Sequence, residues 1–173
     1  MKTFDPDLDT AGRPLRAAGL LLMGAALAYY AYGTAAGLPL GRALVALWVF
    51  LIVAFFVGLL WWMPARLRYR LSDRDLEIQH FLGRRRIQLE NLREVHEVTF
   101  ALGRRSGSAA LPGYYVGRFQ SNLGRLTAYT GRAAGEGVLL VLHTGEQVLL
   151  APKRARLMLA QLRSALPEGA EEA

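Results

Sequence analysis

The sequence of 173 residues contains no cysteine, only three histidines, and only two lysines among its 21 basic residues. The lack of cysteine excludes disulfides, thiol nucleophiles and thiolate metal sites, and it agrees with a domain in the reducing cytosol. Because 53% of the residues are hydrophobic, collagen-like, disordered and disulfide-stapled proteins are excluded as well. What remains is a protein with a substantial apolar part.

Charge is missing from two long stretches near the N-terminus, residues 17–41 and 43–63. Of the 49 residues in the range 15–63, 39 are apolar, against 52 of the other 124. A helix needs roughly 20 apolar residues to cross a bilayer. We therefore predict a transmembrane hairpin with helices at about 15–32 and 42–63, joined by a glycine-containing turn.

Each predicted helix has an alternative interpretation. The second ends in Trp61 and Trp62, which we expect as anchors at the membrane interface. It could instead be a buried helix of a soluble protein, but such helices seldom stay apolar on all sides over this length. The first could be a cleaved signal peptide with small residues at 34–36. Three aspartates in the preceding segment cancel its positive charge, which argues against a signal peptide.

The basic residues that flank the two helices predict the orientation of the hairpin. The connecting turn carries a single arginine, whereas both outer flanks carry several. The outer basic residues are Lys2, Arg13 and Arg16 before the first helix, and Arg66, Arg68, Arg70 and Arg74 after the second. We therefore predict a cytoplasmic N-terminal tail at residues 1–14 and a cytoplasmic domain after the hairpin.

Residues 65–166 are predicted to form one domain, followed by an acidic tail at 167–173. Short segments of this domain alternate between apolar and polar residues, which is typical of half-buried strands. The predicted strands are 66–71, 76–80, 86–89, 95–100, 114–120, 125–130, 138–143 and 147–150. Residues 101–113 are rich in Gly, Ser and Ala and are predicted as a loop. From residue 155 the apolar residues recur at helical spacing, so we expect an all-β arrangement of seven or eight short antiparallel strands followed by an amphipathic helix that could cap a strongly bent sheet.

Three stretches of this domain resemble a known family. The first is a strand, turn and strand at 69–78, and the second is a basic strand that enters an acidic turn at 83–95. The third is Pro-Gly-x-x-x-Gly-x-Phe at 112–119, followed by a strand that begins at Gly124. Together they resemble the bacterial pleckstrin-homology (PH) domain proteins with two N-terminal membrane helices. The resemblance implies a barrel of about seven strands closed by a C-terminal helix, in a bacterial inner membrane, and it implies no activity.

The sequence offers no recognisable catalytic, metal or cofactor site. The three histidines fall on separate predicted strands, without the spacing of metal ligands. Ser106 and Ser108 lack the Gly-x-Ser-x-Gly setting of a nucleophile, and residues 131–137 lack the Gly-Lys-Ser/Thr of a phosphate loop. We therefore expect no enzyme, no cofactor and no metal.

The basic residues are the strongest functional signal. Residues 64–173 contain 17 basic and 11 acidic residues, which places nearly all of the net charge of +7 on the predicted domain. Anionic lipid headgroups attract such clusters, and arginine forks suit phosphate. The candidate headgroup or partner contacts are Arg66, Arg68, Arg70, Arg84, Arg85, Arg86, Arg104 and Arg105. The alternative is that these arginines only set the topology or form a solvated turn.

Two functions remain open. The first is a non-enzymatic, membrane-anchored interaction module that binds a protein partner or anionic lipid. The second is an auxiliary or homo-oligomer-forming subunit of a membrane transport or envelope system, in which the helices make the contacts. Nucleic acid is disfavoured as a partner, because no helix-turn-helix or aromatic RNA-binding motif accompanies the basic charge.

Overall fold

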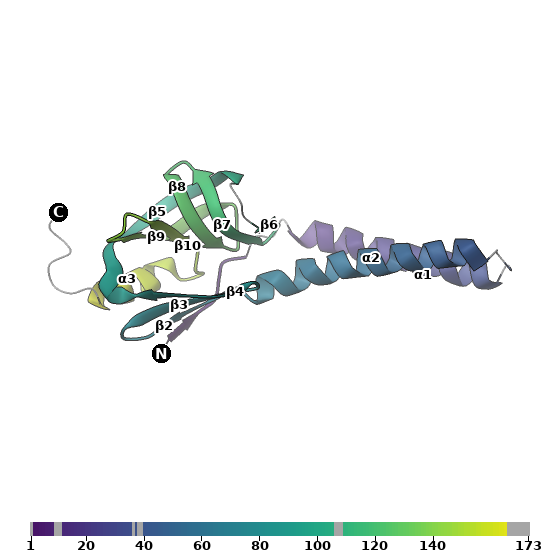
Figure 1. The fold of residues 1–173 in the computed structure, drawn as a ribbon, viewed down its shortest axis with the longest axis horizontal. Helices are drawn as coiled ribbons and strands as arrows, with labels where there is room; N and C mark the ends of the chain where they lie inside the picture. Colours follow the sequence, from purple (N-terminus) through teal and green to yellow (C-terminus); the bar gives the residue numbers. More distant parts are fainter. Residues whose placement is uncertain (1, 9–11, 36, 38–39, 106–108, 166–173) are drawn as a thin grey trace. The chain divides into compact units, whose positions relative to one another are not determined.

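The computed structural model of the chain describes residues 2–8, 12–35, 37, 40–105 and 109–165 (Figure 1). It divides into two compact units, and the chain passes from the first to the second and back again. The first unit comprises Met1–Asp9 with Met63–Ala173, and the second comprises Thr10–Trp62. The predicted acidic tail at 167–173 lies outside the described residues.

The second unit consists of two long helices. Helix α1 spans Gly12–Ala35 and helix α2 spans Leu40–Ala65, so both begin earlier and end later than the sequence predicts. The helices approach closely at Gly19, where a Cβ atom would collide with the side chain of Val57. Their outer surfaces are apolar, and Leu21 and Trp48 are 76% and 64% exposed. Water disfavours such a surface on an isolated protein.

One stretch of the described residues is long and apolar enough to cross a membrane. It is Leu47–Ala65 in α2, with a mean hydropathy of 2.2. The apolar part of α1, Ala17–Gly33, is shorter than that criterion requires. The transmembrane hairpin therefore stays a prediction.

A four-stranded antiparallel sheet forms one side of the first unit. Its order is β1 (Lys2–Phe4), β2 (Arg68–Leu71), β3 (Asp75–His80) and β4 (Gly83–Gln88). Alternate residues point inward, and these are apolar and buried: Tyr69, Leu71, Leu76, Ile78 and Ile87. The alternation that predicted three of these strands therefore reflects one buried face and one solvent face.

Strand β1 comes from the segment that the sequence places in an N-terminal tail. It pairs with β2, with Thr3 opposite Arg70, and Phe4 is only 6% exposed. The following residues continue along the domain. The Asp7 amide donates to the Ala151 carbonyl at 2.8 Å, and the Lys153 amide donates to the Asp5 carbonyl at 3.0 Å. The N-terminal segment is thus an integral part of the domain.

Five strands close into a barrel in the order β5, β9, β10, β8 and β7, because β7 pairs back onto β5. Their bounds are β5 Leu92–Arg105, β7 Tyr114–Ser121, β8 Gly124–Thr130, β9 Ala134–Leu142 and β10 Gln147–Leu150. The short strand β6, Ala109–Leu111, extends the edge of β7. Buried side chains fill the interior: Phe100, Phe119, Leu126, Ala128, Leu139, Leu149 and Ala151.

Two features differ from the predicted antiparallel barrel of about seven strands. First, only five strands close, and β1–β4 form a sheet of their own. Second, β10 pairs with β8 in parallel. Strand β10 turns back tightly from β9 and is inserted between β9 and β8, so its direction matches that of β8. A hydrophobic pattern carries no information about such an insertion.

The predicted loop at 101–113 is also wrong in part. Strand β5 continues to Arg105, and a second strand occupies Ala109–Leu111. The glycine at 103 signals a close approach of two strands rather than a loop, because a Cβ atom there would lie 3.0 Å from the Gln120 carbonyl oxygen. Glycine therefore permits β5 to reach β7 and close the barrel.

The C-terminal helix α3, Ala155–Ala165, confirms the predicted amphipathic helix. Its buried residues are Met158, Leu159 and Leu162. They recur at helical spacing, and the helix lies against β5 and β9 (Figure 1). A single turn of 3₁₀ helix, Leu89–Asn91, connects β4 to β5 within the stretch 83–95, where the sequence has a basic strand that enters an acidic turn.

Candidate functional site

Four of the predicted arginines share the outer face of the four-stranded sheet. The register places Arg68 and Arg84 on either side of Gln79, and Arg70 and Arg86 on either side of Glu77. Cross-strand neighbours of this kind lie about 5 Å apart at Cβ. We call Arg68, Arg70, Arg84 and Arg86 the arginine face. Arg66 is exposed and precedes β2, and Trp61 and Trp62 are exposed near the end of α2.

Two carboxylates partly neutralise the arginine face. Arg84 lies 3.7 Å from Glu77, and Arg86 lies 3.8 Å from Asp75. Both arginine side chains are at least 70% exposed, so these pairs contribute about 0–1 kcal/mol to stability. The guanidinium groups can therefore exchange these partners for another anion at little cost.

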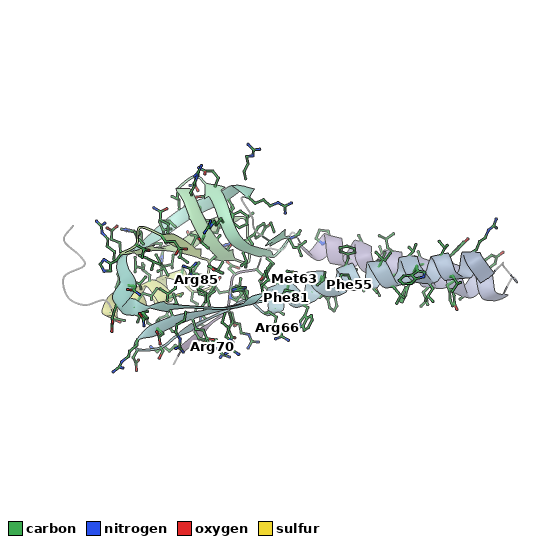
Figure 2. All side chains as sticks on the ribbon, in the orientation of Figure 1. Phe55, Met63, Arg66, Arg70, Phe81 and Arg85 are labelled. Atoms are coloured by element: carbon green, nitrogen blue, oxygen red, sulfur yellow. The ribbon has the colours of Figure 1, made fainter. Side chains whose placement is uncertain are left out.

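Arg85 points to the opposite side of the sheet from its two neighbours. Figure 2 shows Arg85 between the sheet and the barrel, with Arg70 on the other side. Its Nη2 donates to Glu146 Oε2 at 2.6 Å, and its Nη1 donates to the Tyr129 hydroxyl at 3.3 Å. The hydrogen bond between Arg85 and Glu146 raises the pKa of Arg85 and lowers the pKa of Glu146. Arg85 thus connects the two sheets and is already occupied by a partner.

Buried tyrosines complete this connection between the sheets. The Tyr69 hydroxyl donates to the Tyr129 carbonyl oxygen at 2.6 Å, and burial raises the pKa of Tyr69. The Tyr114 hydroxyl accepts a hydrogen bond from the Phe81 amide at 3.0 Å. His80 packs beside the Tyr129 ring, with 5.5 Å between ring centres, and burial lowers its pKa. The tyrosine hydroxyls therefore have structural partners, whereas His80 Nδ1 is buried without a hydrogen-bond partner among the described residues.

Arg104 and Arg105 line a hollow on the barrel together with two arginines that the sequence analysis did not single out. The hollow has a volume of about 770 Å³. We call its four arginines, Arg104, Arg105, Arg118 and Arg125, the arginine hollow. Strand β7 contributes Arg118 and strand β8 contributes Arg125, and the other two come from the end of β5.

Strand register explains why Arg118 and Arg125 share one side. A turn at 122–123 joins β7 to β8, so Gln120 pairs with Arg125 and Arg118 pairs with Thr127. Phe119 and Leu126 alternate with them and are buried. This alternation was visible in the sequence, and counting pairs back from the turn would have found the shared face. The contribution of β5 was not visible, because it depends on closure of the barrel.

The arginine hollow has little negative charge of its own. Within the described residues, none of its four arginines has a carboxylate oxygen within 4.0 Å. Glu146 also lines the hollow, but it holds Arg85 with Oε2 and accepts the Thr127 hydroxyl hydrogen bond on Oε1 at 3.0 Å. Its charge is shared between Arg85 and Arg118, so the lining carries four positive charges against one negative charge.

Among the described residues, no group of three or more His, Cys, Asp or Glu side chains could hold a metal ion. The pair His96–Glu94, at 3.0 Å, is solvent-exposed, and its hydrogen bond lowers the pKa of Glu94. The prominent polar features of the domain are therefore arginine surfaces.

Comparison with known protein families identifies the family of this domain. A family described as bacterial PH domain matches residues 67–166, which is more than half of the chain. The chain belongs to the bacterial PH domain family. This PH domain runs from the residue before β2 to the end of α3, and β1 lies outside the matched range. A search of curated proteins and a search of solved structures found no match.

The family match and the fold agree on a binding module. PH domains are typically interaction modules without catalytic activity, and this chain has the barrel and the C-terminal helix of such a domain. Fold alone does not identify the ligand, so the ligand has to be inferred from the arginine surfaces.

Proposed function

We propose that this bacterial PH domain protein is a non-enzymatic interaction module that α1 and α2 anchor in the cytoplasmic membrane. In this proposal the PH domain lies on the cytoplasmic side, and its arginine face binds anionic lipid headgroups or an acidic protein partner. The pairing of β1 with β2 is the observation that carries the proposal, because these strands precede and follow the two helices.

The argument from β1 is topological. A chain that leaves a domain and returns to it crosses a membrane an even number of times. Leu47–Ala65 satisfies the requirement for one crossing. A single crossing would separate β1 from β2, so α1 must provide a second. Its 24 residues extend about 36 Å, and the 17 residues of Ala17–Gly33 reach the lower end of the length range of known transmembrane helices.

The exposed surfaces of the helices support the same proposal. Tyr32, Val45 and Phe56 are all more than half exposed. Apolar side chains on all sides of a helix pair are expected where lipid is the solvent. Only Arg42 is charged between Arg16 and Arg66, so the charge rule places the connecting turn outside and the PH domain inside.

The position of the arginine face along the chain supports lipid as its ligand. Four residues separate Met63 from Arg68, and even a fully extended chain spans only about 3.5 Å per residue. Cytoplasmic surfaces of membranes are negative, and each nearby arginine contributes about 1 kcal/mol of attraction. The four arginines of this face would therefore hold the sheet on an anionic surface.

The absence of cysteine makes a direct test simple. Gln79→Cys provides a single attachment site for a label, and its two cross-strand neighbours are Arg68 and Arg84. The full chain with bimane at this position is reconstituted in phosphatidylcholine bilayers with headgroup-nitroxide lipid, with or without phosphatidylglycerol. We expect stronger quenching with phosphatidylglycerol, and we expect salt to reverse it because screening weakens exposed charge interactions.

The double variant Arg84→Gln/Arg86→Gln should abolish the lipid-dependent increase in quenching. Arg104→Gln/Arg105→Gln is the matched control, since it removes the same charge from another surface and should leave the increase in place. Equal quenching in neutral and anionic bilayers would refute headgroup binding by the arginine face and leave a protein as its partner.

A hollow between the helices favours a second candidate function. It has a volume of about 780 Å³ and is lined mainly by apolar residues of both helices, among them Leu22, Tyr29, Val45, Val49 and Val53. A transmembrane helix of another subunit would fill such a surface. In that case, replacement of both helices by an unrelated hairpin would remove the partner and leave lipid contact by the arginine face unchanged.

A further inference from the structure

We propose that the arginine hollow is a second binding site, separate from the arginine face, and that it takes a ligand with a diphosphate or two neighbouring phosphate groups. The site consists of Arg104, Arg105, Arg118 and Arg125, which line the hollow together with segments of β7 and β8. This inference goes beyond the proposed membrane contact, because the two surfaces belong to different sheets.

The charge balance of the hollow identifies the class of ligand. Four arginines line one hollow, and Glu146, which also lines it, is bound by Arg85 and Thr127. A dicarboxylate would carry only two negative charges. Each terminal phosphate group carries about −1.5 to −2, so a diphosphate comes close to neutralising four arginines. Arginine forks also bind phosphate oxygens in pairs, which gives them geometric selectivity for this group.

The shape of the hollow agrees with a small ligand. Its volume of about 770 Å³ lies within the range of roughly 300–1,000 Å³ that is usual for small-molecule sites. Polar groups other than arginine also line it, namely Gln120, Thr127 and Gln147. The side-chain amides of Gln120 and Gln147 can donate hydrogen bonds to phosphate oxygens, whereas the Thr127 hydroxyl already donates to Glu146.

The barrel holds these arginines in place. Arg118 and Arg125 stand on paired strands in a fixed register. Arg105 pairs with Phe119 after an irregularity in the β5–β7 register that follows Leu102, and Gly103 permits the close approach there. Irregularities of this kind often redirect side chains beside binding sites. The site therefore needs little rearrangement to bind, which lowers the entropic cost of binding.

The ligand could be soluble or attached to a lipid, and the experiment separates these sources. The full chain in neutral detergent micelles is titrated calorimetrically with inorganic pyrophosphate, with farnesyl diphosphate in the same micelles, and with phosphatidylglycerol. Similar affinity for the first two probes supports a soluble diphosphate. Much tighter binding of farnesyl diphosphate supports a lipid diphosphate. Binding of neither diphosphate, or binding of phosphatidylglycerol to the Arg84→Gln/Arg86→Gln variant as tight as that of the diphosphates, would overturn the proposal.

Variants test whether the hollow is the site. Arg118→Gln/Arg125→Gln should weaken diphosphate binding about 100-fold, because removal of each charge-assisted hydrogen-bonding group weakens binding roughly tenfold. Arg74→Gln/Arg154→Gln removes the same charge from exposed positions outside both arginine surfaces and should change the affinity less than about twofold. Equal weakening by both pairs would show general electrostatic attraction and would contradict a site in the hollow.

A second pair keeps the test valid if the first variant does not fold. Arg104→Gln/Arg105→Gln changes exposed residues at the end of β5 and should weaken diphosphate binding to a similar extent. The outcome is independent of the proposed membrane contact, because quenching of the label at position 79 reports the arginine face and calorimetry reports the hollow.

Discussion

At the scale of single residues, the contact between Arg85 and Glu146 has the clearest role. It joins the four-stranded sheet to the turn between β9 and β10, and Thr127 adds a hydrogen bond from β8. Both side chains of the ion pair are partly buried, so removal of one leaves the other without its partner. Glu146 also interacts electrostatically with Arg118 of the arginine hollow.

The lowered pKa of Glu146 predicts how this contact responds to pH. A carboxyl with a lower pKa in the folded protein stabilises the fold above its unfolded pKa, and this stabilisation is lost as pH falls through the folded pKa. Glu146→Gln should therefore lower the free energy of unfolding by about 1–2 kcal/mol at neutral pH, a value reduced by partial exposure. The difference from the wild type should shrink as pH falls below the ordinary value of 4.5.

Urea unfolding of the full chain in neutral detergent at several pH values, followed by circular dichroism, measures this difference. Glu90→Gln is the matched control, because Glu90 is exposed and its replacement should give only a small change. A difference between Glu146→Gln and wild type that stays constant down to acidic pH would contradict the role assigned to the ion pair.

The alternation of side chains between the two faces of a strand explains what the sequence could predict about the candidate sites. The run Arg84–Arg86 reads as one basic cluster, yet alternation in β4 turns Arg85 inward and leaves its neighbours outward. Arg118 and Arg125 were missed because they are seven residues apart, although the turn between them places both on one face. The charge count was sufficient to locate basic surfaces, but the pairing of strands was needed to assign them.

At the scale of elements, β1 is the feature that ties the helices to the domain. It has three residues and no strong alternation, so the sequence alone predicts a tail. Its stability comes from long-range contacts: the pairing with β2, the burial of Phe4, and the ion pair of Asp7 with Arg132 at 2.8 Å. For the longer strands with alternating patterns, the predicted bounds agree with the structure to within a few residues. Strand β6 and the end of β5 were not predicted, because their positions depend on closure of the barrel.

Loosening β1 should expose the edge of β2. Phe4→Ala removes a buried ring, which typically costs about 3 kcal/mol. Gly131→Ala should act in the same direction, since its Cβ atom would lie 2.5 Å from the Asp7 carbonyl oxygen. Hydrogen exchange with mass spectrometry should show at least about tenfold faster exchange of the amides in Arg68–Leu71. Lys2→Ala changes an exposed side chain of the same strand and should leave exchange unaltered. Unchanged exchange in both test variants would mean that β1 does not hold the edge of β2.

At the scale of the whole molecule, the chain consists of a PH domain that is interrupted near its N-terminus by two apolar helices. The family match begins at residue 67 and omits β1, but the compact unit includes both sides of the interruption. Under the proposed membrane anchoring, this arrangement constrains the topology more strongly than hydropathy does, because both compact parts of the domain must then lie on the same side. The central claim is therefore that α1 and α2 both cross the membrane and return the chain to the same side.

Labelling of single cysteines from outside the cell tests this claim most directly, since the natural chain contains no cysteine. Thr3→Cys lies in β1, Ala35→Cys lies at the end of α1, and Ser72→Cys follows β2, and all three positions are exposed. With a membrane-impermeant maleimide on intact spheroplasts, we expect labelling at position 35 alone, with labelling at positions 3 and 72 only after permeabilisation. Labelling of positions 3 and 72 from opposite sides of the membrane, or protection of all three until permeabilisation, would contradict the account.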